Sequence, residues 1–264
     1  MQGGKKKNQS SPLLLWGIYP ILEIVKTHPR QLKQIFISPQ KPNPRLQEII
    51  DLADEKEISV EFSKEAFANA VKKIDTATVA HQGVVAVSDP FPTVGLSELI
   101  EIIQGQSTHN TSPTILVLDS IQDPQNVGAI MRSALAAGVA GVIIAKDRSA
   151  HLGGAVAKAS AGAISRLKIC QVVNLTAVLQ ALKEIGLWIY GTLPDADVSL
   201  YDTDLTGPLC LVMGGEQKGL RPLVRKQCDF FLSIPMMGGL GSLNASTATA
   251  IILFEIVRQK QIVR

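Results

Sequence analysis

Residues 115–145 read ILVLDSIQDPQNVGAIMRSALAAGVAGVIIA and predict one complete strand–helix–strand unit. The apolar run 115–119 is the first strand. Asp123 is a good N-cap for the following helix, which has Pro124 at its first position and Gly138 as its stop. The run GVIIA that ends the stretch supplies the second strand. Two strands joined by a helix are typical of a parallel sheet covered on both faces, so the stretch favours an α/β fold.

The same alternation of strands and helices continues on both sides of this unit. Before it, the pattern predicts helices over 19–27, 45–56 and 64–72 and strands over 34–37, 58–62 and 84–87. After it, the pattern predicts helices over 155–163, 175–185 and 245–261 and strands over 167–170, 187–192, 209–213 and 230–234. We therefore expect an α/β protein whose larger part contains a mostly parallel sheet.

Changes in composition divide the chain into four parts. Residues 1–11 are polar and rich in Lys, which predicts a disordered basic tail, and residues 12–88 form a first, small α/β domain. Residues 89–112 are rich in Pro, Gly, Ser and Asn around one short helix expected at 96–103, which is typical of a linker. Residues 113–264 form the second domain.

The amino terminus resembles a signal peptide only in outline. Three lysines precede the apolar run 13–25, but Pro20 and Glu23 interrupt that run and no A-x-A cleavage site follows it. The run is also too short to span a bilayer. We therefore expect a cytoplasmic protein without a membrane partner, whose first domain opens with a helix.

Composition limits the classes of partner and of site. The chain has 264 residues, 46% of them hydrophobic, and a net charge of +3, which permits a nucleic-acid partner without demanding one. Aromatic residues make up only 5%, so a broad base-stacking platform is not expected. With four His and no Cys or His at metal-ligand spacing, we expect no metal site. We expect reduced, mostly buried thiols at the three cysteines, Cys170, Cys210 and Cys228.

Three Gly-rich segments, each after an apolar strand, carry the candidate chemistry. They are DSIQDPQNVGAIMRS at 119–133, LVMGGEQKGL at 211–220 and SIPMMGGLGSLNAST at 233–247. Segments at the carboxyl ends of parallel strands meet at one edge of a sheet, which is where such folds bind ligands. The polar residues that they bring are Asn126, Arg132, Glu216, Ser242 and Asn244. The set is unusual for an enzyme because it contains no catalytic His, Cys or Asp cluster.

Taken singly, each segment has a structural interpretation beside the functional one. Arg132 could project into a pocket toward a phosphate or an oxyanion, but its spacing favours an ordinary surface Arg. Glu216 could bond a ribose hydroxyl or hold a catalytic Arg, or could simply belong to a strand-to-helix turn. Asn244 is as consistent with a helix cap as with a ligand contact.

Together, DPQNVGAIMRSALAAGV, MGGEQKGL and SIPMMGGLGSLNAS resemble the SPOUT class of RNA methyltransferases, specifically the TrmH/SpoU-type 2′-O-ribose methyltransferases, over residues 114–264. GIYPILEIV at 17–25 and AHQGVVAV at 80–87 resemble the RNA-binding domain of the bacterial 23S rRNA guanosine-2′-O-methyltransferase subgroup, which is similar to ribosomal proteins L30e and L7Ae. Two alternatives remain: a tRNA 2′-O-ribose methyltransferase of the same family, or a non-enzymatic RNA-binding or ribosome-assembly protein.

The resemblance implies a deep trefoil knot in the second domain, an exception to the usual unknotted topology. It also implies that S-adenosyl-L-methionine binds to the knotted loops, largely through backbone groups. By matching position, the cofactor pocket uses Thr192, Gly214, Gly215, Ile234, Met236 and Leu243. Such enzymes are homodimers, and the interface is expected on helix 245–261 and the helix after Asp123.

The resemblance further implies how the reaction proceeds. Arg132 acts as the base that takes the ribose 2′-hydroxyl proton, or more conservatively clamps the neighbouring phosphate and stabilises the developing alkoxide. Asn126, Glu216, Ser242 and Asn244 orient Arg132 and the ribose, and no metal is required. The first domain selects the RNA, 23S rRNA or an assembling large subunit. A modest basic face, balanced by nearby acidic residues, is expected at Lys26, Arg30, Lys33, Lys41 and Arg45.

Overall fold

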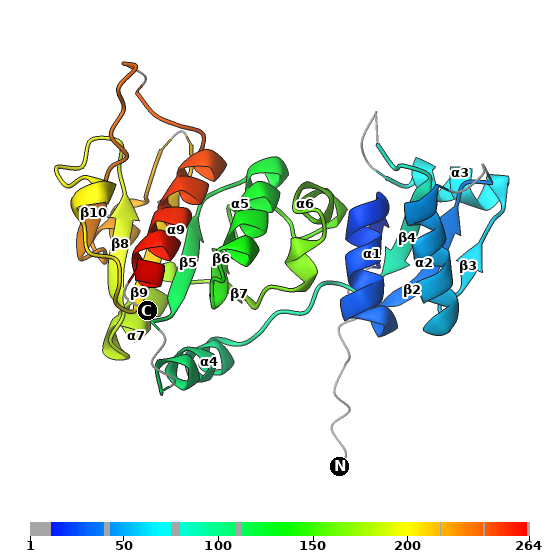
Figure 1. Cartoon of the computed structure of the whole chain (residues 1–264), viewed down its shortest axis with the longest axis horizontal. Helices are drawn as coiled ribbons and strands as arrows, with labels where there is room; N and C mark the ends of the chain where they lie inside the picture. The colour runs from blue at the N-terminus through cyan, green and yellow to red at the C-terminus, as the bar shows by residue number, and fades with distance from the viewer. Residues whose placement is uncertain are drawn as a thin grey trace, which may run out of the picture. The chain divides into compact units, whose positions relative to one another are not determined.

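The computed structural model describes residues 12–39, 43–74, 80–108, 112–216, 218–239 and 241–262. The chain forms two compact units. The first comprises the described residues up to Phe91 together with Leu152–Ser165, and the second comprises Pro92–His151 and the residues from Arg166 onward (Figure 1). The tail expected at 1–11 lies outside the described residues.

The first unit contains a four-stranded sheet in the order β1-β4-β2-β3. Strand β4 is antiparallel to β1 and β2, and β3 is parallel to β2. The strands are β1 (Leu13–Trp16), β2 (Leu32–Ile37), β3 (Val60–Glu61) and β4 (Val84–Ser88). The helices are α1 (Ile18–Thr27), the short 3-10 helix η1 (Pro29–Gln31), α2 (Pro44–Glu55) and α3 (Lys64–Lys72). The three helices expected here are therefore present.

The first unit begins with strand β1, whereas the sequence pattern predicted a disordered tail and then a helix as the first element. Leu13 pairs with Ser88 and Trp16 pairs with Val85, so the run becomes an edge strand because β4 offers it a partner. Gly17, with a φ of +92°, then separates the strand from α1. Four apolar residues without alternation do not distinguish a strand from a helix, so the sequence pattern alone missed this element.

The second unit contains a six-stranded sheet in the order β10-β8-β9-β5-β6-β7, and every one of its ladders is parallel. The strands are β5 (Thr114–Asp119), β6 (Gly141–Ala145), β7 (Ile169–Val172), β8 (Trp188–Thr192), β9 (Leu209–Gly214) and β10 (Phe230–Leu232). The expected α/β class with a mostly parallel sheet is thereby confirmed. Parallel strands place their carboxyl ends at one edge, where the three Gly-rich segments follow β5, β9 and β10.

Helices cover the sheet of the second unit. They are α4 (Leu96–Thr108), α5 (Pro124–Ala136), α7 (Leu175–Glu184), α8 (Pro222–Arg225) and α9 (Ala245–Ile262), with a 3-10 turn η3 at Leu200–Asp202. Helix α5 begins as predicted, because Asp123 Oδ1 accepts a hydrogen bond from the backbone N–H of Gln125 at 3.0 Å. Helix α4 lies within the expected linker 89–112, and its Leu99 and Ile103 belong to the core of this unit.

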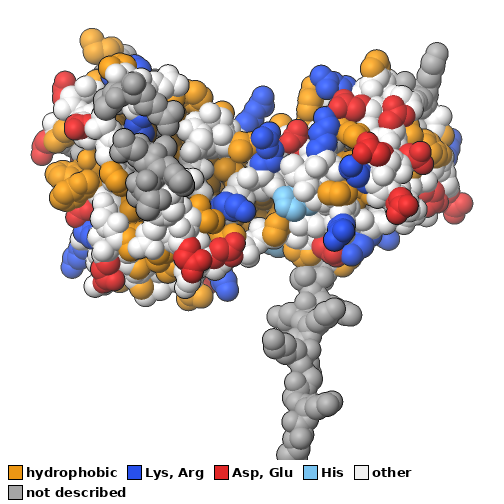
Figure 2. Space-filling model, turned by 60° about the horizontal axis from the view of Figure 1, so that its bottom comes forward, with side chains coloured by type: hydrophobic (Ala, Val, Ile, Leu, Met, Phe, Trp, Pro, Cys, Tyr) orange, Lys and Arg blue, Asp and Glu red, His pale blue; other side chains and the backbone are white. Residues whose placement is uncertain are grey.

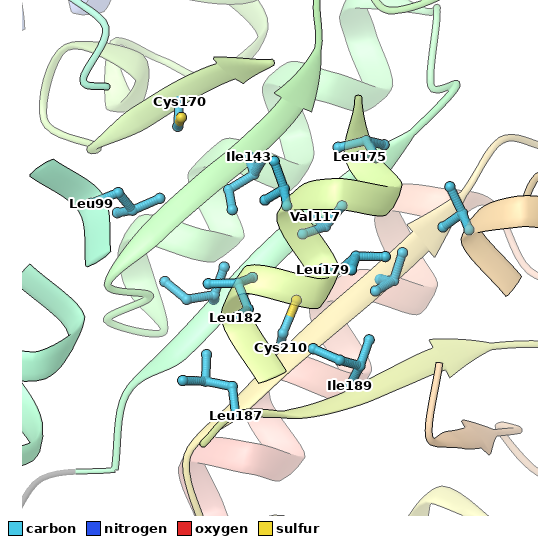
Figure 3. Close-up of a cluster of buried hydrophobic side chains, with 14 of the residues drawn as sticks. Leu99, Val117, Ile143, Cys170, Leu175, Leu179, Leu182, Leu187, Ile189 and Cys210 are labelled. Atoms are coloured by element: carbon cyan, nitrogen blue, oxygen red, sulfur yellow. The ribbon is translucent and has the colours of Figure 1, made fainter. Parts of the chain in front are cut away.

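The main core lies between the sheet and the helices α4 and α7 (Figure 3). Val117 and Ile143 of the strands meet Leu99 of α4 and Leu182 of α7. Side chains alternate along a strand, so Leu116 of β5 faces the opposite side of the sheet. Helices α5 and α9 pack against each other, and α9 contacts β9. Each fully buried Leu or Ile stabilises the fold by about 1.5–3 kcal/mol.

The segment Leu152–Ser165 belongs to the first unit although it lies between two strands of the second sheet in sequence. It contains α6 (Gly154–Ala159) and the 3-10 turn η2 (Ala163–Ser165), where a single helix over 155–163 was expected. Lys158 Nζ donates to Gln82 Oε1 at 2.6 Å, and the same oxygen accepts from the Ile18 N–H at 3.1 Å. The Gln82 side chain therefore connects this segment to the start of α1 within the first unit.

Candidate functional site

A pocket of about 760 Å³ lies at the carboxyl ends of β8, β9 and β10 in the second unit. Its walls come from the residues that follow each of these strands and from the start of α9. The volume lies in the range of pockets that hold small ligands and cofactors. Part of its surface is apolar and comes from Leu232, Ile252 and Ala248, among others.

All six residues expected to bind the cofactor line this pocket: Thr192, Gly214, Gly215, Ile234, Met236 and Leu243. They come from three separate loops, which the parallel sheet brings to the same edge. Thr192 is fixed by the bond from its Oγ1 to the Val212 carbonyl oxygen at 3.3 Å. Their roles toward a cofactor stay a prediction.

The loop after β9 depends on the absence of side chains at two positions. A Cβ on Gly214 would lie 2.4 Å from the carbonyl carbon of Gly219, and a Cβ on Gly215 would lie 2.6 Å from the carbonyl oxygen of Ser120. The loop is closed by a bond from the Gly219 N–H to the Gly215 carbonyl oxygen at 2.8 Å. The two glycines therefore allow this loop to lie against other backbone of the same chain.

Three of the five predicted catalytic residues also line the pocket: Glu216, Ser242 and Asn244. Asn126 lies beneath them on α5 and is only 7% exposed. Its Nδ2 donates to Glu216 Oε1, and its Oδ1 accepts from Asn244 Nδ2 at 2.9 Å. One side chain thus connects the three Gly-rich segments, which are separated by up to 118 positions in the sequence.

Asn244 caps a helix, as one of its two interpretations predicted, and its contact with a ligand stays a prediction. Its Oδ1 accepts from the backbone N–H of Ser246 at 2.9 Å and of Thr247 at 3.3 Å, which caps α9. Its Nδ2 remains available for the bond to Asn126. A carboxylate at this position could cap the helix but could not donate, so the Asn is required for the connection.

Arg132 lies apart from this cluster. It is on the exposed side of α5, and within the described residues it makes no hydrogen bond to Asn126, Glu216, Ser242 or Asn244. The hydrogen bond of Glu216 goes to Asn126, and the expected role of Glu216 in holding Arg132 stays a prediction. An exposed Arg remains free to meet an RNA phosphate.

Two residues beside the pocket were missed by the sequence reading. Asp119, at the end of β5, is fully buried, and its carboxylate accepts from the backbone N–H of Arg221 at 2.8 Å and from Arg221 Nε at 2.5 Å. The available signal was a charged residue at the end of an otherwise apolar, buried strand. Its partner lies 102 positions away, so the pairing itself was not visible in the sequence.

The cysteines lie away from this chemistry. All three are free, and burial raises their pKa values, that of Cys228 to about 12. Such thiols stay protonated at neutral pH and are poor nucleophiles. Within the described residues, no three His, Cys, Asp or Glu side chains are grouped as a metal site would require. The helices of the described residues are likewise too short or too polar to cross a bilayer.

The first unit has a smaller cavity of about 510 Å³ between the end of β2 and α3. Its polar groups are Ser38, Lys64 and His81, and Phe67 forms an apolar wall. The rings of Phe67 and His81 meet edge to face with centroids 5.1 Å apart. His81 Nδ1 accepts from the Gly83 N–H at 3.0 Å, so in the neutral ring the donor is Nε2.

The basic face expected on this unit is largely neutralised. Lys26 pairs with Glu48 at 2.7 Å, Arg45 pairs with the same carboxylate at 3.3 Å, and Lys33 pairs with Asp89 at 2.6 Å. Lys41 lies outside the described residues. In Figure 2, Lys and Arg side chains on this unit are interspersed with Asp and Glu.

Comparison with known proteins gives matches over almost the whole chain. The family model described as the SpoU rRNA Methylase family matches residues 113–254, and the model described as RNA 2′-O ribose methyltransferase substrate binding matches residues 14–94. A Pseudomonas putida protein named 23S rRNA (guanosine-2′-O-)-methyltransferase RlmB is 40% identical over 252 residues, which is 95% of this chain and 98% of that protein. The Escherichia coli K12 protein of the same name is 36% identical over 247 residues, 94% of this chain and 98% of that protein.

Among solved structures, the SpoU methyltransferase AviRb from Streptomyces viridochromogenes, in complex with the cofactor AdoMet, matches with a TM-score of 0.73. The two are 25% identical, and the match covers 98% of this chain and 94% of that chain. Both units of the present structure are therefore included in the similarity.

Proposed function

The chain belongs to the SpoU rRNA methylase family, and from this premise we propose that it transfers a methyl group from S-adenosylmethionine to the 2′-oxygen of a guanosine ribose in 23S rRNA. The observation that carries the proposal is the bridge from Asn126 to Glu216 and Asn244, which brings the three Gly-rich segments together at one pocket. Relatives that carry this activity by name match 94–95% of the chain.

The pocket after β8, β9 and β10 fits the cofactor. Its volume is sufficient, its apolar side chains suit an adenine ring, and Gly214, Ile234 and Leu243 are among the residues that line it. S-adenosylmethionine supplies an already activated methyl group when bound. Positioning by the protein therefore provides much of the catalysis.

The protein's own groups act on the ribose. We assign to Arg132 the clamping of a phosphate and the stabilisation of the negative charge that develops on the 2′-oxygen as the hydroxyl proton leaves to water. Its side chain is exposed, and a guanidinium presents several N–H donors to an oxyanion. Asn126 holds Glu216 and Asn244 at the rim of the pocket, where their oxygens and N–H groups can orient the ribose hydroxyls. Ser242 lies on the same rim.

We propose that the first unit selects the RNA. Support comes from the substrate-binding family model, which matches residues 14–94, and from the cavity beside α3, where Lys64 and the His81 Nε2–H are available to a phosphate and a base edge. The ion-paired lysines of α1 and β2 are weaker candidates, because a phosphate would have to displace a carboxylate from each.

We also propose a homodimer, a cytoplasmic location and the trefoil knot, as the family resemblance implies. The dimer is supported by α9, which leaves Phe254 50% and Ile262 70% exposed on the second unit. Contiguous apolar patches on a surface mark contacts with other proteins, and both of these side chains lie on one helix. Helix α5 packs beside α9 and would extend the interface.

Calorimetric titration with S-adenosylmethionine and a methyl-transfer assay with two RNAs, unmodified 23S rRNA and total tRNA, test the proposal. The purified protein is expected to bind S-adenosylmethionine and to methylate unmodified 23S rRNA, but not total tRNA. Methylation of tRNA alone would favour the tRNA enzyme of the same family. Binding of RNA without any affinity for S-adenosylmethionine would identify a non-enzymatic RNA-binding protein and contradict the proposal.

A further inference from the structure

We propose that Asp119 and Arg221 form a positioning pair that holds Glu216 in place for methyl transfer. The inference rests on the proposed function, because it concerns the same site. Neither residue lines the pocket, so neither is expected to touch the cofactor or the ribose. Their effect would reach the reaction through the loop that carries Glu216.

Asp119 is the hub of this arrangement. It is fully buried, and its carboxylate accepts three hydrogen bonds: from the Arg221 N–H at 2.8 Å, from Arg221 Nε at 2.5 Å and from Ser120 Oγ at 3.1 Å. A buried carboxylate is costly unless it is paired and hydrogen-bonded, and here both conditions are met. Charge-assisted bonds of this kind fix geometry more strongly than neutral ones.

Both ends of the Glu216 loop are fastened to this one residue. At its start, Gly214 of β9 lies directly opposite Asp119 of β5 in the parallel ladder. At its end, Arg221 places its backbone N–H and its guanidinium on the Asp119 carboxylate. The described residues between these two points, 215–216 and 218–220, therefore belong to a short segment that is held near Asp119 at both ends, and Glu216 is one of them.

The interior of the loop leaves little room for adjustment. The Gly219 N–H bonds to the Gly215 carbonyl oxygen at 2.8 Å, and the backbone of Gly215 lies against that of Ser120. If Arg221 were released, the Glu216 carboxylate would move relative to Asn126, which is held independently on α5. We therefore expect the bond from Asn126 Nδ2 to Glu216 to be lost or weakened when the Asp119–Arg221 pair is broken.

A purely structural role would have a different signature from a positioning role. If the pair only stabilised the sheet, its loss would lower stability and its kinetic effect would add to that of removing Glu216. If the pair acts through Glu216, the kcat losses of the two single variants are not additive. Once Glu216 is removed, loss of the pair no longer has a side chain to misplace. A double-mutant cycle on kcat separates the two cases.

The experiment measures kcat, the KM for 23S rRNA, the Kd for S-adenosylmethionine and the thermal midpoint for Asp119→Asn, Glu216→Ala and the double variant. The matched control is Asp229→Asn, since Asp229 also accepts from a backbone N–H, that of Ile189 at 2.9 Å, and from a cation, Lys183 at 2.6 Å. It lies at the start of β10, at the opposite edge of the sheet.

We expect Asp119→Asn to lower kcat by about 10- to 100-fold, as misplacement of a substrate-positioning group does, with the KM for RNA nearly unchanged. In the Glu216→Ala background, the same change should alter kcat by less than about twofold. Loss of the Asn126 side-chain amide resonance from its wild-type position in the NMR spectrum of Asp119→Asn would accompany the effect. Asp229→Asn should keep the wild-type kcat.

Three results would contradict the proposed positioning role: additive losses of kcat in the double variant, a wild-type kcat for Asp119→Asn, or a wild-type kcat for Glu216→Ala. If Asp119→Asn fails to fold, Arg221→Lys replaces it in the same cycle, because lysine keeps the positive charge without the Nε contact. An inactive wild-type protein that does not bind S-adenosylmethionine would instead contradict the proposed function, so the two failures are distinguishable.

Discussion

Asn126 uses both ends of its carboxamide, donating to Glu216 and accepting from Asn244. Replacement by Asp keeps the shape, but it removes the donor and places a second carboxylate against Glu216. We expect Asn126→Asp to lower kcat by about 10- to 100-fold while the Kd for S-adenosylmethionine changes little. Steady-state methyl-transfer kinetics check this.

The control for this variant is Asn174→Asp, which keeps the side-chain oxygen that accepts from the Ala177 N–H and caps α7. It should retain wild-type activity. If Asn126→Asp were equally active, the bridge between the three segments would have no role in the reaction.

At the residue scale, the sequence indicated the polar residues of the site but not the contacts between them. The Gly-rich segments identified Asn126, Glu216 and Asn244, and the structure joins them. Asp119 was not recognised, because its partner Arg221 becomes a neighbour only when β5 and β9 pair. A buried ion pair between distant segments leaves little local pattern in a sequence.

At the scale of elements, the sequence pattern predicted most of the helices, and a capping signal located the start of one of them. Asp123 with Pro124 gave the start of α5, and residues 64–72 correspond to α3, which Ser63 caps by accepting from the Ala66 N–H at 3.2 Å. Strand β1 and the break between α6 and η2 were missed. Strand β1 forms because it pairs with β4, which is distant in the sequence. The break after α6 occurs at a turn that contains Gly162, whose φ is positive.

The close packing of the loop after β9 leads to a testable prediction for Gly215. A methyl group on Gly215 would lie 2.6 Å from the Ser120 carbonyl oxygen, so the loop must shift away from β5. We expect Gly215→Ala to weaken S-adenosylmethionine binding by about tenfold or more, measured by calorimetry. Gly207→Ala is the control, since a Cβ there meets nothing within 4 Å. Equal affinity in both variants would show that the loop tolerates displacement.

The carboxyl end of α9 is fastened by Lys260, whose Nζ donates to the Ser112 carbonyl oxygen at 2.7 Å and to Thr114 Oγ1 at 2.8 Å. Burial lowers the pKa of Lys260 to about 8. Between about pH 8 and the unfolded value near 10.5, the unfolded chain binds more protons than the folded chain, so this group makes stability rise with pH.

We expect the free energy of unfolding of the wild-type protein, relative to Lys260→Met, to increase from pH 8 to pH 10 and to be flat below pH 7. Urea unfolding across this range measures the difference. Replacement of the exposed Lys226 by Met is the control, and its difference from wild type should show a smaller dependence on pH. A difference that falls with pH for Lys260→Met would contradict the assignment.

At the scale of the whole molecule, the two units divide the proposed work between RNA selection and methyl transfer. The proposed dimer makes a testable claim about the second unit. Phe254→Glu places a charge on the exposed face of α9 and is expected to convert the dimer to a monomer in sedimentation-velocity experiments. Phe62→Glu, at a similarly exposed position of the first unit, should leave the dimer intact. Dimers that persist in Phe254→Glu would place the interface elsewhere.

Analysis of the methylated nucleoside tests the proposed activity most directly. Unmodified 23S rRNA is incubated with the protein and S-adenosylmethionine, digested to nucleosides and examined by mass spectrometry, with Arg132→Ala in parallel. We expect 2′-O-methylguanosine from the wild-type protein, at one equivalent per RNA, and at least a tenfold lower rate from Arg132→Ala. A methyl group on a base, or an Arg132→Ala protein as fast as wild type, would contradict the proposed chemistry.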